Sequence, residues 1–151
     1  MKDAPILICY DGSDNAARAI EAAADLLGPR RAVVLDIGPP VTPVESLAAV
    51  APVPPTAVFE ELNEDAAQQR ARAGAELARR VGFLAEPRAG VAAPTWQGIV
   101  DTADEIDAPV VVLGSRGLKG AREALEGSVS HQVAEQAGRP VLIVPPPHGR
   151  S

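Results

Sequence analysis

The chain has 151 residues, of which 46% are apolar and only 3% are aromatic. A chain of this length can bury one core without metals or disulfides, and its composition requires that core to consist of Val, Leu, Ile and Ala. The formal net charge of -6 argues against nucleic acids or anionic membranes as partners, because both need clustered Lys and Arg.

The single cysteine, Cys9, lies inside an apolar run, where a small buried hydrophobic side chain is expected. It cannot form an intrachain disulfide, which indicates a reducing compartment. No segment approaches the ~20 apolar residues that span a bilayer, and the N-terminus lacks the pattern of a secretory signal. We therefore expect a cytoplasmic protein.

The first part of the chain predicts a strand, a helix and a second strand. The apolar run Ile6 to Tyr10 is typical of a buried strand, and the turn residues Asp11 to Asn15 follow it. Apolar residues at helical spacing then predict a helix that ends at Gly28-Pro29. The β-branched run Ala32 to Ile37 predicts a second buried strand.

The middle of the chain predicts a loop, a long helix and an edge strand. Six prolines between residues 39 and 55 exclude regular structure and indicate a surface loop. Residues 57–81 predict an amphipathic helix. The segment Leu84 to Val91 is a weaker strand, and Pro87 within it favours the edge of a sheet. The expected apolar stripe of the long helix is Leu62, Ala66, Ala73, Leu77 and Val81.

The last part repeats the alternation of helix and strand. Thr95 is the expected N-cap of a third helix, and Val110 to Leu113 is the most strand-like stretch of the chain. A Gly-rich loop over residues 114–127 then leads into a helix over residues 128–137. A fifth strand, Val141 to Val144, ends at consecutive prolines.

This alternation of strands and helices predicts an α/β fold. Because crossovers between parallel strands are right-handed, the five strands should form one parallel, Rossmann-like sheet with helices on both faces. The chain shows no internal repeat and no linker. We therefore expect a single domain over residues 1–147 and a flexible tail over residues 148–151.

Two strand ends carry residues suited to binding an anion. Ligands of open parallel sheets bind beyond the carboxyl ends of the strands, where the strand order reverses. The first strand ends at Tyr10-Asp11, and the Gly-rich loop follows the fourth strand. Glycines and free N–H groups at a helix start favour phosphate. The candidate phosphate ligands are Gly114, Gly117, Gly127, Ser128, Val129 and Ser130, with Arg116, Lys119 and Arg122 as nearby positive charges.

Each of these features has a structural alternative. Asp11 is either an acceptor for ribose hydroxyls or a cap of the helix that follows it. Ile37 and Leu113 either form an apolar slot for a base or belong to the core. A Gly-rich loop after a strand is often only a turn.

The Gly-rich loop resembles the ATP-binding signature of the universal stress protein family. It can be written G-x-x-G-x9-G-S, from Gly114 and Gly117 to Gly127-Ser128. The segment Ile6 to Ser13 is also similar to that family's opening strand and D-G-S turn, and the segment from Gly127 to Val144 resembles its last helix and strand. The resemblance spans nearly the whole chain, least clearly residues 39–95.

The resemblance implies a strand order of 3-2-1-4-5 and a set of contacts to ATP, AMP or ADP, with or without Mg²⁺. By this resemblance, Asp11 binds the ribose or adenine, Ile37 and Leu113 line the base pocket, and Gly114 contacts the ribose. The phosphates lie at residues 117 and 127–130. It also implies a homodimer through the fifth strand, Val141 to Val144, whose apolar edge would otherwise be exposed.

The sequence therefore predicts an adenine-nucleotide-binding regulator that acts as a dimer on an unidentified protein partner. No catalytic motif is present, and His131 is expected on the surface, so fast ATP turnover is not predicted. Two alternatives remain: a nucleotide-free interaction module, which the carboxylate of Glu126 beside Gly127 favours, and a slow ATP hydrolase. An adenylating enzyme or a flavin carrier fits less well, because the loop after the first strand and the few aromatic residues do not match them.

Overall fold

The computed structural model describes residues 3–38, 56–90, 94–115 and 129–147, without the side chains of residues 56–61. The loop predicted over residues 39–55 and the tail predicted over residues 148–151 lie outside this description. The strands are β1 (Ile6–Tyr10), β2 (Arg31–Asp36), β3 (Leu84–Arg88), β4 (Val111–Gly114) and β5 (Val141–Val144). The helices are α1 (Asp14–Leu27), α3 (Thr56–Arg80), α4 (Thr95–Glu105) and α6 (Val129–Gln136).

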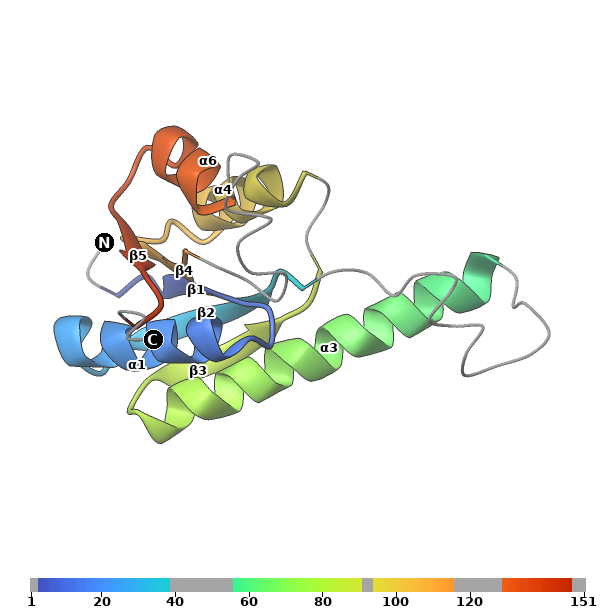
Figure 1. The fold of residues 1–151 in the computed structure, drawn as a ribbon, viewed down its shortest axis with the longest axis horizontal. Helices are drawn as coiled ribbons and strands as arrows, with labels where there is room; N and C mark the ends of the chain where they lie inside the picture. Colours follow the sequence, from blue (N-terminus) through green and yellow to red (C-terminus); the bar gives the residue numbers. More distant parts are fainter. Residues whose placement is uncertain (1–2, 39–55, 91–93, 116–128, 148–151) are drawn as a thin grey trace.

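The five strands form one parallel sheet in the order β3-β2-β1-β4-β5. Helices α1 and α3 cover one face, and α4 and α6 cover the other (Figure 1). This arrangement confirms the predicted Rossmann-like α/β fold and the 3-2-1-4-5 order. The order reverses between β1 and β4, so the two strand ends singled out in the sequence are neighbours.

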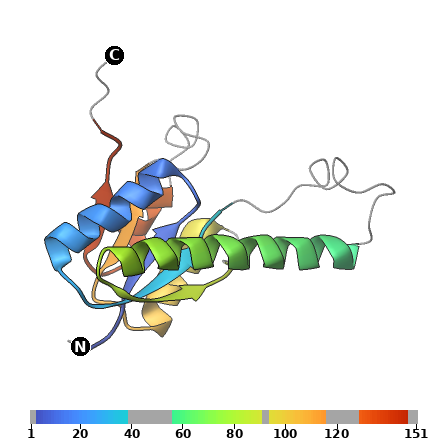
Figure 2. The same cartoon turned by 90° about the horizontal axis from the view of Figure 1, so that it is seen from below.

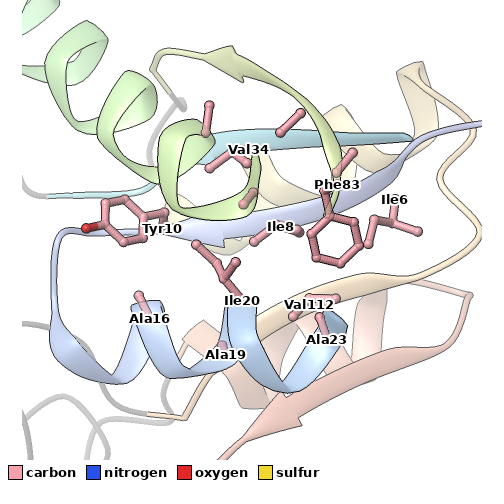
Figure 3. Close-up of a cluster of buried hydrophobic side chains, with 14 of the residues drawn as sticks. Ile6, Ile8, Tyr10, Ala16, Ala19, Ile20, Ala23, Val34, Phe83 and Val112 are labelled. Atoms are coloured by element: carbon pink, nitrogen blue, oxygen red, sulfur yellow. The ribbon is translucent and has the colours of Figure 1, made fainter. Parts of the chain in front are cut away.

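The core on the α1 and α3 face consists of aliphatic strand residues and alanines from the helices. All five residues of β1 are buried, as expected for the central strand of a sheet covered on both faces. Helix α1 packs Ala16, Ala19, Ile20 and Ala23 against the sheet (Figure 3). Their short side chains let the helix lie close to the strands.

The predicted apolar stripe of α3 is wrong. The helix buries Ala67, Ala71, Ala75 and Ala78, whereas Ala73 is exposed. A Cβ atom on Gly74 would lie 2.7 Å from Val34 Cγ1. The helix backbone therefore rests almost directly on β2, and this close approach selects the face with the smallest residues. Leu77 and Val81 pack only at the margin of that core.

Helix α3 is longer than the strands beneath it. Its 25 residues correspond to a length of about 37 Å, whereas the five or six residues of a strand span about 17–20 Å. Its N-terminal turns extend past the sheet in both views (Figures 1 and 2).

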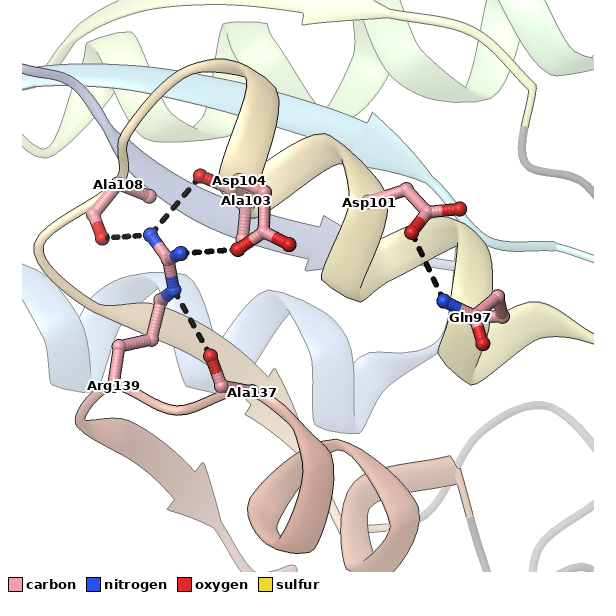
Figure 4. Close-up of polar contacts among 7 residues, drawn as sticks. All are labelled: Gln97, Asp101, Ala103, Asp104, Ala108, Ala137 and Arg139. Atoms are coloured by element: carbon pink, nitrogen blue, oxygen red, sulfur yellow. Dashed lines mark hydrogen bonds and ion pairs between the residues drawn. The ribbon is translucent and has the colours of Figure 1, made fainter.

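The other face is closed by α4 and α6, and Arg139 joins them to the start of β5. Its guanidinium donates hydrogen bonds to the carbonyl oxygens of Ala103 (3.0 Å), Ala108 (2.6 Å) and Ala137 (3.2 Å), and it pairs with the carboxylate of Asp104 (Figure 4). A cation near the last turn of a helix also complements the helix dipole. Arg139 thus holds the C-terminal end of α4 against the sheet.

Thr95 does not cap α4. The helix begins at Thr95 itself, its N-cap is Pro94, and no side chain caps it. The carbonyl of Pro94 accepts from the amides of Gln97 (3.0 Å) and Gly98 (3.3 Å). Because the fixed φ of proline suits the residues at a helix start, the backbone forms this first turn unaided.

Two smaller predictions are confirmed. Strand β3 lies at the edge of the sheet, where Pro87 removes no ladder hydrogen bond from a central strand. Cys9 is a buried free thiol, and burial together with the charge of Asp11 raises its pKa. Within the described part of the chain, no helix has both the length and the apolar character needed to cross a membrane.

Candidate functional site

The candidate site lies at the carboxyl edge of the sheet, where β1 and β4 run side by side. Leu7 pairs with Val111 and Ile8 with Val112, so the same register sets the end of β1 beside Gly114. The turn after β1 and the start of the loop after β4 therefore meet at the point where the strand order reverses. Open α/β sheets bind their ligands at such a point.

The turn after β1 is built by its own side chains. One carboxylate oxygen of Asp11 accepts from the amide of Ser13 (2.9 Å), and Gly12 takes a positive φ of 86°. The hydroxyl of Ser13 accepts from the amide of Ala16 (3.1 Å) and is the N-cap of α1. The cap is therefore Ser13, while Asp11 holds the turn that precedes it.

Gly114 faces the first turn of α1. A Cβ atom there would lie 2.4 Å from Asn15 Nδ2, so only glycine fits without displacing that side chain. The same amide nitrogen donates to the carbonyl of Val144 (3.3 Å), which also accepts from the amide of Ser115 (3.0 Å). The start of α1 and the ends of β4 and β5 thus form one connected unit.

Ile37 and Leu113 pack in the same hydrophobic cluster, on the α4 and α6 face. Leu113 is only 1% exposed and is a core side chain in this structure. Ile37 is half-buried, and its amide donates to the carbonyl of Tyr10 (2.8 Å). Of the two residues predicted to line a base pocket, Ile37 is thus the accessible one.

The side chain of Tyr10 lies on the opposite face of the sheet, among the residues that pack against α1 and α3 (Figure 3). Burial raises the pKa of its hydroxyl, and the charges of Asp11 and Asp14 raise it further. Tyr10 therefore contributes to a site at this edge through its backbone, whereas its ring belongs to the core.

The structure describes only part of the predicted phosphate-binding end. Arg116, Gly117, Gly127 and Ser128 lie outside the described residues, as do Lys119, Arg122 and Glu126. Val129 packs against the hydrophobic cluster of the α4 and α6 face, and Ser130 is buried. Because α6 crosses back to the amino end of β5, its N-terminus lies toward the carboxyl edge of the sheet.

Sequence reasoning missed an ion pair at this edge. Asp36, the last residue of β2, is 2% exposed and accepts from Arg70 Nε (2.6 Å) and Nη2 (3.1 Å). The sequence feature that could have indicated this pair is an acidic residue directly after the apolar residues of β2. Nothing in the local pattern marked Arg70, which lies 34 positions further along the chain.

No catalytic or metal-binding group is apparent among the described residues. The side chain of His131 is 64% exposed, as expected for a surface residue, and its Nε2 lies 3.2 Å from Oε1 of Glu135 on the same helix. The described residues hold no cluster of three or more His, Cys, Asp or Glu side chains suited to a metal ion. A surface hollow of about 500 Å³ lies at β3, away from the carboxyl ends of β1 and β4, and is lined by Arg31, Arg79, Phe83, Leu84, Ala85 and Glu86.

Known proteins share both the sequence and the fold. The model of the universal stress protein family matches residues 4–145. Universal stress protein YxiE of Bacillus subtilis is 33% identical, over 92% of this chain and 97% of its own length. Universal stress protein Rv1636 of Mycobacterium tuberculosis is 31% identical, over 92% of this chain and 94% of its own length.

Among solved structures, hypothetical protein MJ0577 superposes with a TM-score of 0.71 at 21% identity, over 99% of this chain and all of that one. A universal stress protein solved in complex with cAMP superposes with a TM-score of 0.62 at 24% identity, over 95% of this chain and 98% of that one. The structural likeness supports the fold, and the match of the family model over nearly the whole sequence establishes the kinship. The chain belongs to the universal stress protein family.

Proposed function

We propose that this protein binds an adenine nucleotide, with ATP as the principal ligand, at the carboxyl edge between β1 and β4. The observation that carries the proposal is the parallel pairing of β1 with β4 at the reversal of strand order. It sets the Asp11 turn beside Gly114, where the G-x-x-G-x9-G-S segment begins. A related universal stress protein solved with cAMP supports a nucleotide as the ligand class.

The proposed contacts divide between a base and ribose end and a phosphate end. Asp11 accepts hydrogen bonds from the ribose, the accessible side chain of Ile37 contacts the base with the buried Leu113 packed behind it, and Gly114 lets the backbone approach the ribose. The phosphates bind backbone amides near the start of α6, where the helix dipole favours an anion, and Mg²⁺ enters with ATP. The phosphate end comprises Arg116, Gly117, Gly127, Ser128, Val129 and Ser130.

We propose a regulatory rather than a catalytic role in the cytoplasm. Bound ATP would change the surface that a dimer presents to a protein partner, because a ligand shifts conformations through its differential contacts. The dimer forms through β5, an edge strand in which Val141, Leu142 and Ile143 are only half-buried in the single chain.

The first test is chemical analysis of the small molecules that the purified protein carries. Denatured wild-type protein should release ATP or ADP, identified by chromatography and mass spectrometry, while Asp11→Ala should release little. Asp11→Asn keeps an acceptor for the Ser13 amide but loses the charge, so it separates turn stability from ribose binding. Its affinity for ATP should fall about tenfold, the scale of one lost charge-assisted hydrogen bond.

Asp25→Ala on the exposed face of α1 is the matched control, and it should bind ATP like the wild type. No released nucleotide, together with no thermal shift in millimolar Mg-ATP, would overturn the proposal. That result would favour the nucleotide-free interaction module, for which Glu126, immediately before Gly127, is the specific observation.

A further inference from the structure

The buried carboxylate of Asp36 accepts hydrogen bonds from two partners, the guanidinium of Arg70 and the amide of Gly38. Its Oδ1 accepts from Arg70 Nε at 2.6 Å and from the amide of Gly38 at 2.9 Å, and its Oδ2 accepts from Arg70 Nη2 at 3.1 Å. A carboxylate that is 2% exposed requires such partners, and the two-point geometry fixes the plane of the guanidinium. Asp36 therefore holds Arg70 in one orientation.

The Arg70 side chain in turn lies directly against Gly38 and close to Gly12. A Cβ atom on Gly38 would lie 2.2 Å from Nε and 2.7 Å from Cζ of Arg70, and a Cβ atom on Gly12 would lie 3.8 Å from its Cδ. Gly12 belongs to the turn after β1, and Gly38 follows β2. One side chain of α3 thus lies between the segments that leave two neighbouring strands, in tight contact with the one after β2 and near the one after β1.

These two segments carry the base and ribose end of the proposed site. Gly12 directly follows Asp11, and Gly38 directly follows Ile37, whose amide bonds to the carbonyl of Tyr10 at 2.8 Å. A shift of Arg70 would therefore release the backbone at Gly38, which is next to Ile37 and is joined through it to the end of β1.

We infer that Arg70, oriented by Asp36, is a positioning residue of the nucleotide site, which fixes the Asp11 turn relative to Ile37. This inference rests on the proposed function. Arg70 acts through the backbone rather than by touching the nucleotide, because two nitrogens of its guanidinium donate to the buried carboxylate of Asp36. The effect on binding is thus independent of the number of phosphates.

The test uses three variants of the full chain. Arg70→Met keeps the aliphatic stem and removes the guanidinium. The double variant Arg70→Met with Asp36→Asn also removes the buried charge that the single variant leaves without its partner, so it keeps the test valid if the single variant unfolds. Arg72→Met, at an exposed position of the same helix, is the matched control.

Two measurements are made on each variant. Amide hydrogen exchange at Ser13 reports on the turn after β1. No residue of this turn is a hydrogen-bond partner of Asp36, and the measurement needs no nucleotide. Exchange there should be about tenfold faster in both Arg70 variants and unchanged in Arg72→Met, since a local opening is promoted when a packing partner is lost. Affinities for adenosine, AMP and ATP should fall by one common factor of about ten.

The outcomes separate this inference from the proposed function. Wild-type protein that binds no nucleotide counts against the proposed function, and exchange at Ser13 then decides whether Arg70 holds the turn. Intact wild-type binding with unchanged exchange and affinity in the Arg70 variants overturns the inference alone. A loss that grows from adenosine to ATP also overturns it, because it identifies Arg70 as a direct phosphate contact.

Discussion

Single residues in this protein are constrained mainly by how closely two backbones approach. Gly74 is the clearest case, because a Cβ atom there would meet Val34 Cγ1 at 2.7 Å and the Tyr10 ring at 2.9 Å. Neither neighbour can easily move, since Val34 is β-branched and both residues are buried in the sheet. The same close approach explains why α3 turns its alanines rather than its leucines to the core.

We expect Gly74→Ala to lower the free energy of unfolding by about 1 kcal/mol, because overpacking costs about 1–3 kcal/mol and the gain in helix propensity is about 1 kcal/mol. Urea unfolding followed by circular dichroism measures the change. Ala73→Gly, at the exposed neighbouring position, gives the propensity effect alone. A Gly74→Ala variant more stable than the wild type would show that α3 does not rest on β2 at this distance.

At the scale of the elements, the contacts between helix ends and strand starts hold the layers in place. Arg139 is the main example on the α4 and α6 face, since it reaches three carbonyl oxygens and one carboxylate (Figure 4). These partners contribute differently to the stability of the fold. Asp104 is 60% exposed, so its pairing contributes little, whereas the carbonyls lie at the ends of α4 and α6, where the chain turns toward β4 and β5.

Arg139→Met should therefore lower the free energy of unfolding by about 2–3 kcal/mol, as the hydrogen bonds from its charged group to the carbonyls are lost. Asp104→Ala, which removes only the exposed partner, should cost less than about 1 kcal/mol. Thermal and urea unfolding of the two variants measure both values. Equal losses in the two variants would mean that the ion pair, and not the set of carbonyl contacts, stabilises this end of α4.

At the scale of the whole molecule, the outer edge of β5 is the surface on which the proposed dimer depends. The amide of Val111 bonds to the carbonyl of Pro140, and the amide of Ser115 bonds to that of Val144. The backbone groups of successive residues in a strand point in alternate directions. The N–H and C=O groups of Leu142 and Val144 therefore point toward β4, while the N–H groups of Val141 and Ile143 point outward. The proposed dimer pairs strands along this outward row.

Ile143→Pro removes one outward N–H group without removing a bond to β4, and it should convert dimers into monomers. Sedimentation or light scattering over a concentration series measures the change, and a melting curve checks that the monomer is folded. Leu142→Pro is the contrasting variant, since it breaks the ladder to β4 and should destabilise the fold itself. An unchanged dimer in Ile143→Pro would exclude pairing through this edge.

Much of the fold could be predicted because its strands are short apolar runs bounded by proline, glycine and turn residues. The predicted starts and ends of β1, β2, β4 and β5 agree with the structure to within one residue. The edge position of β3 also followed from Pro87. Part of the candidate site could be predicted from the sequence for the same reason, since Asp11 directly follows one such run and Gly114 ends another.

The amino-acid sequence by itself determined the order of the elements, the α/β class and the strand ends at which a ligand site was expected, because periodicity and turn residues are local properties. Only the tertiary structure decided which face of α3 is buried and that Asp36 meets Arg70. These features depend on distances between segments far apart in the chain. Small side chains allow several packings, and the one adopted is selected by how closely helix and sheet approach.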